Sequence, residues 1–203
     1  MKLLYVGDIS KQDAMVLYKY ASRATNILEF GSGASTQVLA HSAAKITSID
    51  TEQAWIDNAR QNVKDLGLKE VDFVYWDNRQ EAYKATYDVV FDDGDPPFRK
   101  QFFNEVFKSL SVGGKLLAHD TRCPSNWLYE AISDNQNEID NVVINQDDSN
   151  ITVVTKGILK PYQNWHLTEN RDYWEFAQVN SVKPPDWKEI LLSKAPEVVD
   201  PLV

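Results

Sequence analysis

The sequence predicts a doubly wound α/β domain whose sheet is mostly parallel, with one reversed terminal strand. Two observations predict it. Between residues 10 and 134, short apolar runs alternate with amphipathic segments of helical spacing, as in sheets covered by helices on both faces. After that, Val142–Ile144 and Ile151–Val154 are separated by a polar loop too short to hold a helix, which indicates an antiparallel hairpin.

Apolar spacing places each element in order. Ser10 can cap a helix that runs to about residue 23, with Ala14, Leu17 and Ala21 on one face. Gly113 and Gly114 are expected to end a later helix whose apolar face runs from residue 102 to 110. Further helices are expected at 36–44, 52–66 and 125–134. Strands are expected at 26–30, 45–49, 71–75, 87–91 and 115–118.

We expect residues 1–156 to form this domain and residues 157–203 to form a C-terminal extension, because the alternation stops there. The extension carries three tryptophans and five prolines, and is too aromatic to be wholly disordered. We expect it to be a lid, a wrap around the domain or an oligomer contact. The chain is therefore a candidate homo-oligomer.

Bulk composition narrows the function classes. No apolar run approaches the roughly 18–20 residues that span a bilayer, and the first residues lack a signal peptide pattern. The single cysteine, Cys123, excludes an intrachain disulfide, so we expect a cytoplasmic protein. A formal net charge of −9, with scattered Lys and Arg, disfavours nucleic acid and favours a small-molecule substrate.

Polar residues follow every strand of the predicted parallel sheet. In such sheets ligands bind beyond the carboxyl ends of the strands. The polar clusters are residues 29–36, Asp50, residues 77–78, residues 92–95 and residues 119–120. Five clusters at one edge predict a binding site there.

A glycine turn follows the first strand and leads into a helix. Gly31 and Gly33 lack the Cβ atoms that would keep a ligand from the backbone N–H groups. Glu29 precedes the turn, where a carboxylate can hold the ligand or brace the loop. Thr36 stands where dinucleotide-binding turns have a third glycine, which disfavours NAD. Asp50 ends the next strand, where an acid can accept both ribose hydroxyls of a nucleoside.

Residues 26–36 together with 46–50 resemble the first two motifs of class I S-adenosylmethionine-dependent methyltransferases, in the branch of catechol-type O-methyltransferases. The resemblance implies a Rossmann-like methyltransferase sheet and S-adenosylmethionine as cofactor. It also implies that the glycine turn meets the methionine part of the cofactor. Asp77 matches the family position that hydrogen-bonds adenine, although an acid there is as often a helix cap. The implied cofactor-binding set is Glu29, Gly31, Ser32, Gly33, Ser35, Thr36, Asp50, Asp77 and Asp92.

The same family holds a divalent cation with an acid after the fourth strand and an Asp-Asn pair after the fifth. Asp93 matches the first position, and His119 and Asp120 fall at the pair with different residue types. Pro96 also replaces a histidine found in related enzymes. Three readings stay open: a metal held by Asp93, His119 and Asp120, His119 as a general base beside Asp93, or residues that only cap the strand.

Three functions compete on these residues. The first is S-adenosylmethionine-dependent methyl transfer to a small molecule, most plausibly at a hydroxyl. The second is a related domain that binds the cofactor without transferring a methyl group. The third is an NAD-dependent oxidoreductase. Phe98 and Arg99, in the loop after the fourth strand, are candidate acceptor contacts, although an exposed arginine at a helix start is the more common case.

Overall fold

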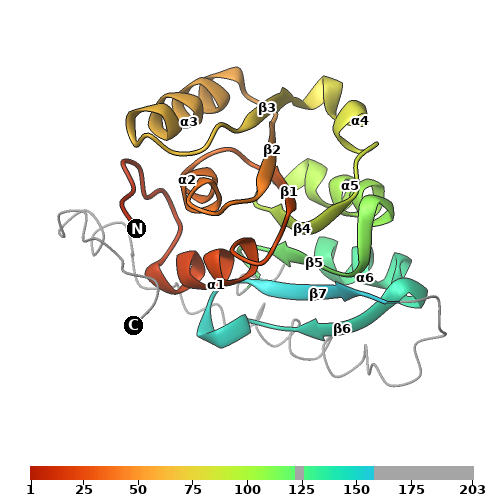
Figure 1. Cartoon of the computed structure of the whole chain (residues 1–203). Coiled ribbons are helices and arrows are strands. Elements are labelled where there is room, and N and C mark those ends of the chain that lie inside the picture. Colours follow the sequence, from red (N-terminus) through yellow and green to blue (C-terminus); the bar gives the residue numbers. More distant parts are fainter. Residues whose placement is uncertain (122–125, 158–203) are drawn as a thin grey trace.

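The computed structural model describes residues 1–121 and 126–157, which form one seven-stranded sheet with helices on both faces (Figure 1). The strand order is β3-β2-β1-β4-β5-β7-β6. The strands are β1 Asn26–Phe30, β2 Lys45–Asp50, β3 Asp72–Tyr75, β4 Tyr87–Asp92, β5 Leu110–Ala118, β6 Ile139–Val143 and β7 Thr152–Lys156. The predicted doubly wound sheet is confirmed.

The predicted reversed strand is β7. It pairs antiparallel with β5 on one side and with β6 on the other, whereas the pairs from β3 to β5 are all parallel. In the chain β7 comes last, and in space it lies between β5 and the edge strand β6. The hairpin predicted from the polar loop at 145–150 therefore places its second strand, β7, beside β5.

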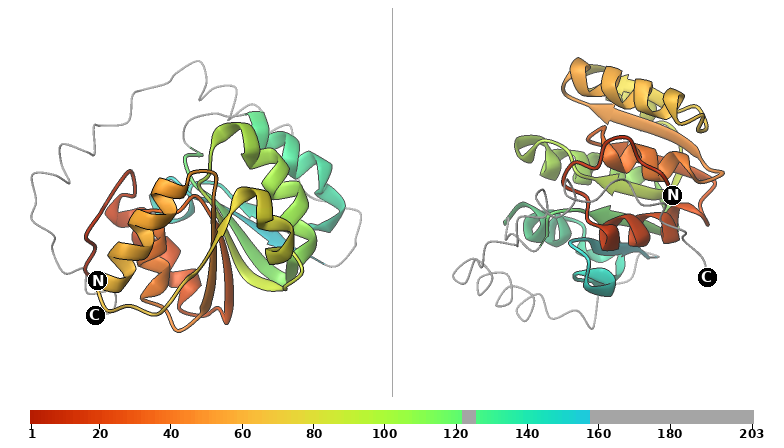
Figure 2. Two further views of the ribbon diagram at one scale, coloured as in Figure 1. Left: turned by 90° about the horizontal axis from the view of Figure 1, so that it is seen from above. Right: turned by 90° about the vertical axis from the view of Figure 1, so that its left-hand side faces the viewer.

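The helices divide between the two faces of the sheet. Figure 2 shows α1, α2 and α3 on one face and α4, α5 and α6 on the other. Their bounds are α1 Lys11–Ala21, α2 Ala34–Ala40, α3 Gln53–Asp65, α4 Arg79–Ala82, α5 Pro96–Val106 and α6 Asn126–Asp134. Each layer encloses its own apolar core, so the central strand β1 is buried on both faces from Ile27 to Phe30. Among the described helices, none is long and apolar enough to cross a bilayer.

Local sequence explains where two of these helices begin. At α1, the Ser10 hydroxyl accepts from the Asp13 N–H while the Asp13 carboxylate accepts from the Ser10 N–H, a reciprocal cap. At α5, Pro96 and Pro97 occupy the first turn, where a missing N–H costs nothing. The α5 start lies directly after β4, so these prolines also fix the turn that leaves the sheet.

The structure corrects two predicted boundaries. Gly113 and Gly114 do not end a helix, because α5 ends at Val106 and β5 begins at Leu110 and runs through both glycines. Gly113 has φ +80°, and the register between β4 and β5 shifts at this point, so the glycines bend a strand. The helix expected at 36–44 is α2, which begins at Ala34, two residues earlier, and ends at Ala40, four residues earlier. The one-turn helix α4 was not expected.

The C-terminal extension predicted at 157–203 falls outside the described residues from 158 onward, as do residues 122–125. Its expected role as lid, wrap or oligomer contact stays a prediction. The described fold brings the carboxyl ends of β1, β2, β4 and β5 to one edge of the sheet, and the candidate site lies there.

Candidate functional site

One cavity opens at the carboxyl edge of the sheet, above β1. Its walls come from four stretches of chain: residues 5–9, 30–35, 50–55 and 93–95. The predicted glycine turn and Asp50 therefore meet at one hollow. The first stretch, which precedes α1, was assigned no role from sequence.

The two glycines of the turn differ in what an added Cβ atom would contact. Gly31 has φ +93°, and a Cβ there would lie 2.4 Å from the carbonyl oxygen of Asp93, so glycine is required by the close crossing of the loop after β4. At Gly33 a Cβ would meet no atom within 4 Å. Only Gly33 therefore fits the expectation that a missing side chain leaves room for a ligand.

Asp50 lines the cavity and is 6% exposed. Its carboxylate accepts from the backbone N–H of Ser32 at 2.6 Å and from that of Glu52 at 2.8 Å. Burial raises the pKa of Asp50, and these two N–H groups oppose that shift. Asp50 thus ties the glycine turn to the start of α3 while facing the cavity.

Glu29 is fully buried and does not line the cavity among the described residues. Its Oε2 accepts from the hydroxyls of Thr36 at 2.7 Å and Ser48 at 2.5 Å, and the Thr36 hydroxyl accepts from the Gly33 N–H at 2.8 Å. Burial raises the pKa of Glu29 to about 7, against the lowering effect of hydrogen bonds from Ser35, Ser48 and Thr36. Of its two predicted roles, the geometry matches the brace.

Two further predicted cofactor residues lie away from the cavity lining. Asp77 is exposed on the 3-10 turn Trp76–Asn78 after β3. Asp92 is fully buried at the end of β4. Burial raises the pKa of Asp92 to about 6, although the Arg99 guanidinium opposes that shift. Ser32 and Ser35, from the same predicted set, line the cavity.

Arg99 is a structural residue rather than an exposed acceptor contact. It is 5% exposed, and its Nε donates to Asp92 Oδ1 at 3.1 Å. Its Nη2 donates to the carbonyl oxygens of Asp92 and His119 at 2.7 and 2.8 Å. The guanidinium also packs 4.4 Å from the Trp127 ring centroid. Arg99 therefore clamps the ends of β4 and β5 together.

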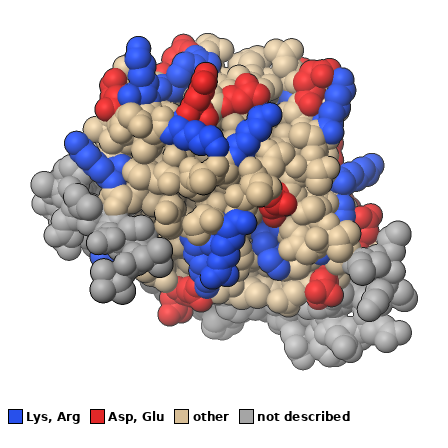
Figure 3. Space-filling model, viewed as in Figure 1, with Lys and Arg blue, Asp and Glu red and all other residues tan. Residues whose placement is uncertain are grey.

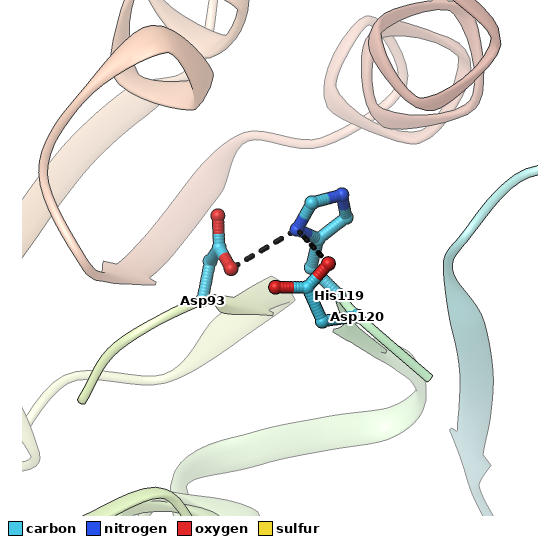
Figure 4. A group of neighbouring side chains, drawn as sticks. All are labelled: Asp93, His119 and Asp120. Carbon is cyan, nitrogen blue, oxygen red and sulfur yellow. Dashed lines mark hydrogen bonds and ion pairs between the residues drawn. The ribbon is translucent and has the colours of Figure 1, made fainter. Parts of the chain in front are cut away.

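A cluster of three side chains lies beside this clamp. It consists of Asp93, His119 and Asp120 (Figure 4). His119 is 1% exposed, and its Nδ1 lies 3.0 Å from Asp93 Oδ1 and 3.6 Å from Asp120 Oδ1. One donor atom from each residue lies within 4.8 Å of the other two. Burial by itself lowers the pKa of His119, but the carboxylates outweigh it and raise that pKa well above its usual value. Only Asp93 of the three lines the cavity.

Asp13, a residue that the sequence analysis missed, faces the other side of the His119 ring. Its Oδ2 lies 3.4 Å from His119 Nε2, an ion-pair distance without hydrogen-bond geometry. Burial raises the pKa of Asp13, but the nearby His119 ring and the hydrogen bond from the Ser10 hydroxyl lower it to about 2. Asp13 also accepts from the Asn150 N–H at 2.6 Å. In the sequence, Asp13 is only the partner of Ser10 in the cap of α1, and no local signal connects it to His119.

The cavity is acidic. Asp8, Asp50, Asp93 and Asp95 line it, and within residues 1–121 and 126–157 no Lys, Arg or His does. Elsewhere the charges mix: on the face in Figure 3, Lys and Arg are interspersed with Asp and Glu over the described residues. The four aspartates of the cavity favour a ligand with positive charge.

Comparisons with known proteins support the fold described above. The methyltransferase domain family matches residues 21–180. No curated protein matches the chain. Many solved structures share the fold, and three of them are given below. A methyltransferase-like protein from Silicibacter pomeroyi is 17% identical with TM-score 0.59, covering 84% of this chain and 95% of its own. An O-methyltransferase from Bacillus cereus, solved with SAH, is 21% identical with TM-score 0.61, covering 73% and 83%.

The third is an O-methyltransferase from Streptomyces achromogenes involved in tomaymycin synthesis, solved with SAM. It is 16% identical with TM-score 0.58, covering 74% of this chain and 82% of its own. At these identities the likeness concerns the fold, while the family match spans most of the chain. The chain therefore belongs to the methyltransferase domain family, with the class I, O-methyltransferase-like fold that its glycine turn and terminal hairpin predict.

Proposed function

We propose that the protein transfers a methyl group from S-adenosylmethionine to a hydroxyl of a small molecule. The observation that carries the proposal is the acidic cavity in which the glycine turn meets Asp50. The turn offers backbone N–H groups, and Asp50 offers a carboxylate at the position suited to ribose hydroxyls. The O-methyltransferase neighbours support oxygen as the acceptor atom.

Charge favours this cofactor over NAD. S-adenosylmethionine carries a sulfonium and an ammonium against one carboxylate, whereas NAD carries a pyrophosphate. Four aspartates line the cavity, and no cation from the described residues accompanies them. A pyrophosphate in that field would be repelled, whereas a sulfonium would be attracted. Thr36, where a dinucleotide turn has glycine, is instead used to close the turn through Gly33.

Methyl transfer from a sulfonium is a displacement, so the enzyme must align the acceptor and remove its proton. Asp93 is the member of the His119 cluster that faces the cavity, so we assign it the contact with the acceptor hydroxyl. His119 is buried and holds the other side of that carboxylate. We therefore assign His119 to orienting and charge-stabilising Asp93 rather than to direct contact.

The cluster also fits a divalent cation. Two carboxylates and one imidazole converge within 4.8 Å, and Asp13 stands behind the imidazole as carboxylates do behind metal-bound histidines. Asp93, His119 and Asp120 would be the ligands, and a bound cation would lower the pKa of the acceptor hydroxyl. The single imidazole favours a softer ion than Mg²⁺.

Titration calorimetry tests the cofactor. We expect S-adenosylmethionine and S-adenosylhomocysteine to bind and NAD not to. Failure of both sulfur ligands to bind would remove the proposed function, and preferred NAD binding would favour an oxidoreductase. Binding without turnover over a panel of hydroxyl acceptors would favour the second candidate, a cofactor-binding domain. The departure of His119 and Asp120 from the family's Asp-Asn pair is the observation behind that candidate.

A chelator separates the two roles of the cluster. If a cation is used, activity is lost in chelator and returns with a divalent ion, and Asp93→Asn abolishes the ion's binding measured by calorimetry. Turnover that resists the chelator would leave Asp93 and His119 to act without metal. A cytoplasmic location and a homo-oligomeric state stay predictions of the sequence.

A further inference from the structure

The N-terminal segment, residues 1–9, forms part of the cavity wall. Tyr5, Gly7, Asp8 and Ile9 line the same hollow as the glycine turn. The methyltransferase family match begins at residue 21, so this part of the wall lies outside the matched residues. The segment precedes α1 and crosses the carboxyl edge where the cofactor is proposed to bind.

Two anchors hold the segment in place. Gln37, fully buried in α2, accepts from the Leu4 N–H at 2.7 Å and donates to the Tyr5 carbonyl at 2.9 Å, as a neighbouring strand would. At the other end the backbone passes into the capped start of α1 at Ser10. Between them Gly7 has φ +55°, and a Cβ there would lie 3.0 Å from the Tyr5 ring. Both anchors therefore determine where the Tyr5 ring lies.

Tyr5 faces a second aromatic ring, that of Trp55. The ring centroids are 5.9 Å apart and tilted by 42°. The two residues are 36% and 39% exposed, and both line the cavity. Trp55 comes from the start of α3, five residues after Asp50 on the same connection. The exposed ring pair thus stands beside the carboxylate assigned to the ribose.

We infer that Tyr5 and Trp55 form an aromatic wall that holds the nucleoside part of the cofactor against Asp50, with Gln37 and Gly7 as positioning residues. The inference rests on the proposed function. In proteins that bind nucleic acid, aromatic side chains gain affinity by stacking on the faces of the bases. A nucleoside bound against these rings would also bury ring surface that is exposed in the described structure.

Calorimetry on the full chain tests the wall with two probes, S-adenosylhomocysteine and 5′-methylthioadenosine, which lacks the amino-acid part. We expect Tyr5→Ala and Trp55→Ala each to weaken both probes about tenfold, by the same factor for each probe. Tyr5→Phe should keep wild-type affinity because the ring and not the hydroxyl makes the wall. Tyr20→Ala, at the far end of α1, is the matched control and should change neither affinity.

The positioning role has its own test. Gln37→Leu should weaken S-adenosylhomocysteine, and adding it to Tyr5→Ala should cause no further loss, because Gln37 acts through Tyr5. Circular dichroism and melting temperature check that each variant folds. If wild type binds and Tyr5→Ala binds equally well, the wall is wrong while the proposed function stands. A loss confined to S-adenosylhomocysteine would also overturn the assignment to the nucleoside. If wild type binds neither probe, the proposed function fails first.

Discussion

The two halves of the carboxyl edge use their acids in opposite ways. On the β1–β2 half, Asp50 is held by two backbone N–H groups and still faces the cavity. On the β4–β5 half, Asp92 is held by the Arg99 guanidinium, and His119 lies between carboxylates from three elements. Asp50, held by backbone N–H groups, is therefore open to a ligand, whereas Asp92, held by a buried guanidinium, is closed to one.

The comparison predicts that Arg99 supports the β4–β5 half. Arg99→Met should lower the free energy of unfolding by about 3–5 kcal/mol, because it leaves Asp92 buried without a partner charge. Urea unfolding measures the change. Arg60→Met is the control, since Arg60 pairs with Asp57 at the surface and should cost less than about 1 kcal/mol. Equal small losses in both variants would show that the clamp is not needed.

The glycine turn offers a pair of variants that sharpens the first half. Gly31→Ala should cost about 3 kcal/mol of stability, because its Cβ would press on the Asp93 carbonyl and φ is +93°. Gly33→Ala has open space and extended φ, so stability should change by less than about 0.5 kcal/mol. Chemical denaturation compares them. If Gly33→Ala weakens the cofactor without destabilising the fold, Gly33 faces the ligand, and unchanged affinity would exclude that role.

The Glu29 brace predicts a pH dependence. The folded pKa of Glu29, about 7, lies above its ordinary 4.5, so the native state binds more protons between these values. Its contribution to stability is complete below about pH 4.5 and falls by about 3 kcal/mol as pH rises through 7. Glu29→Gln removes this ionisation, so its stability relative to wild type should increase from pH 5 to pH 8.

Melting temperatures across that range measure the difference between Glu29→Gln and wild type. Glu81→Gln, which alters an exposed carboxylate, is the control and should show a constant difference from wild type. A Glu29→Gln difference that does not change with pH would mean that Glu29 is ionised in the fold at all of these pH values.

Asp50 carries the smallest predicted effect in free energy. Asp50→Ala should weaken the binding of S-adenosylhomocysteine more than tenfold, equivalent to at least about 1.4 kcal/mol, because the carboxylate proposed to bind the ribose is lost. Calorimetry measures it, with melting temperature as the check on folding. Glu52→Ala, which removes an exposed acid two residues later, should leave the affinity unchanged. Equal affinity in Asp50→Ala and wild type would remove Asp50 from the cofactor site.

The predicted site residues divide into those that line the cavity and those whose polar atoms are bound by other side chains. Gly33 and Asp50 were predicted from one turn and one strand end, Ser32 and Ser35 were implied by the family resemblance, and all four line the cavity. Asp92 also lies at a strand end, but its carboxylate is paired with Arg99. From the sequence, the more common case for Arg99 is an exposed arginine at a helix start. Local spacing places a residue at the edge of the sheet. It does not tell which neighbour will occupy its polar atoms.

Sequence by itself determined the alternation of strands and helices, the glycine turn, the acid at Asp50 and the terminal hairpin, because each depends on residues close together in the chain. Tertiary structure alone decided that Gly31 is required by the loop after β4, that Asp13 stands behind His119 and that Tyr5 faces Trp55. Each of these contacts joins segments that are far apart in the chain and meet only when the sheet and its helices assemble, so no local pattern predicts it.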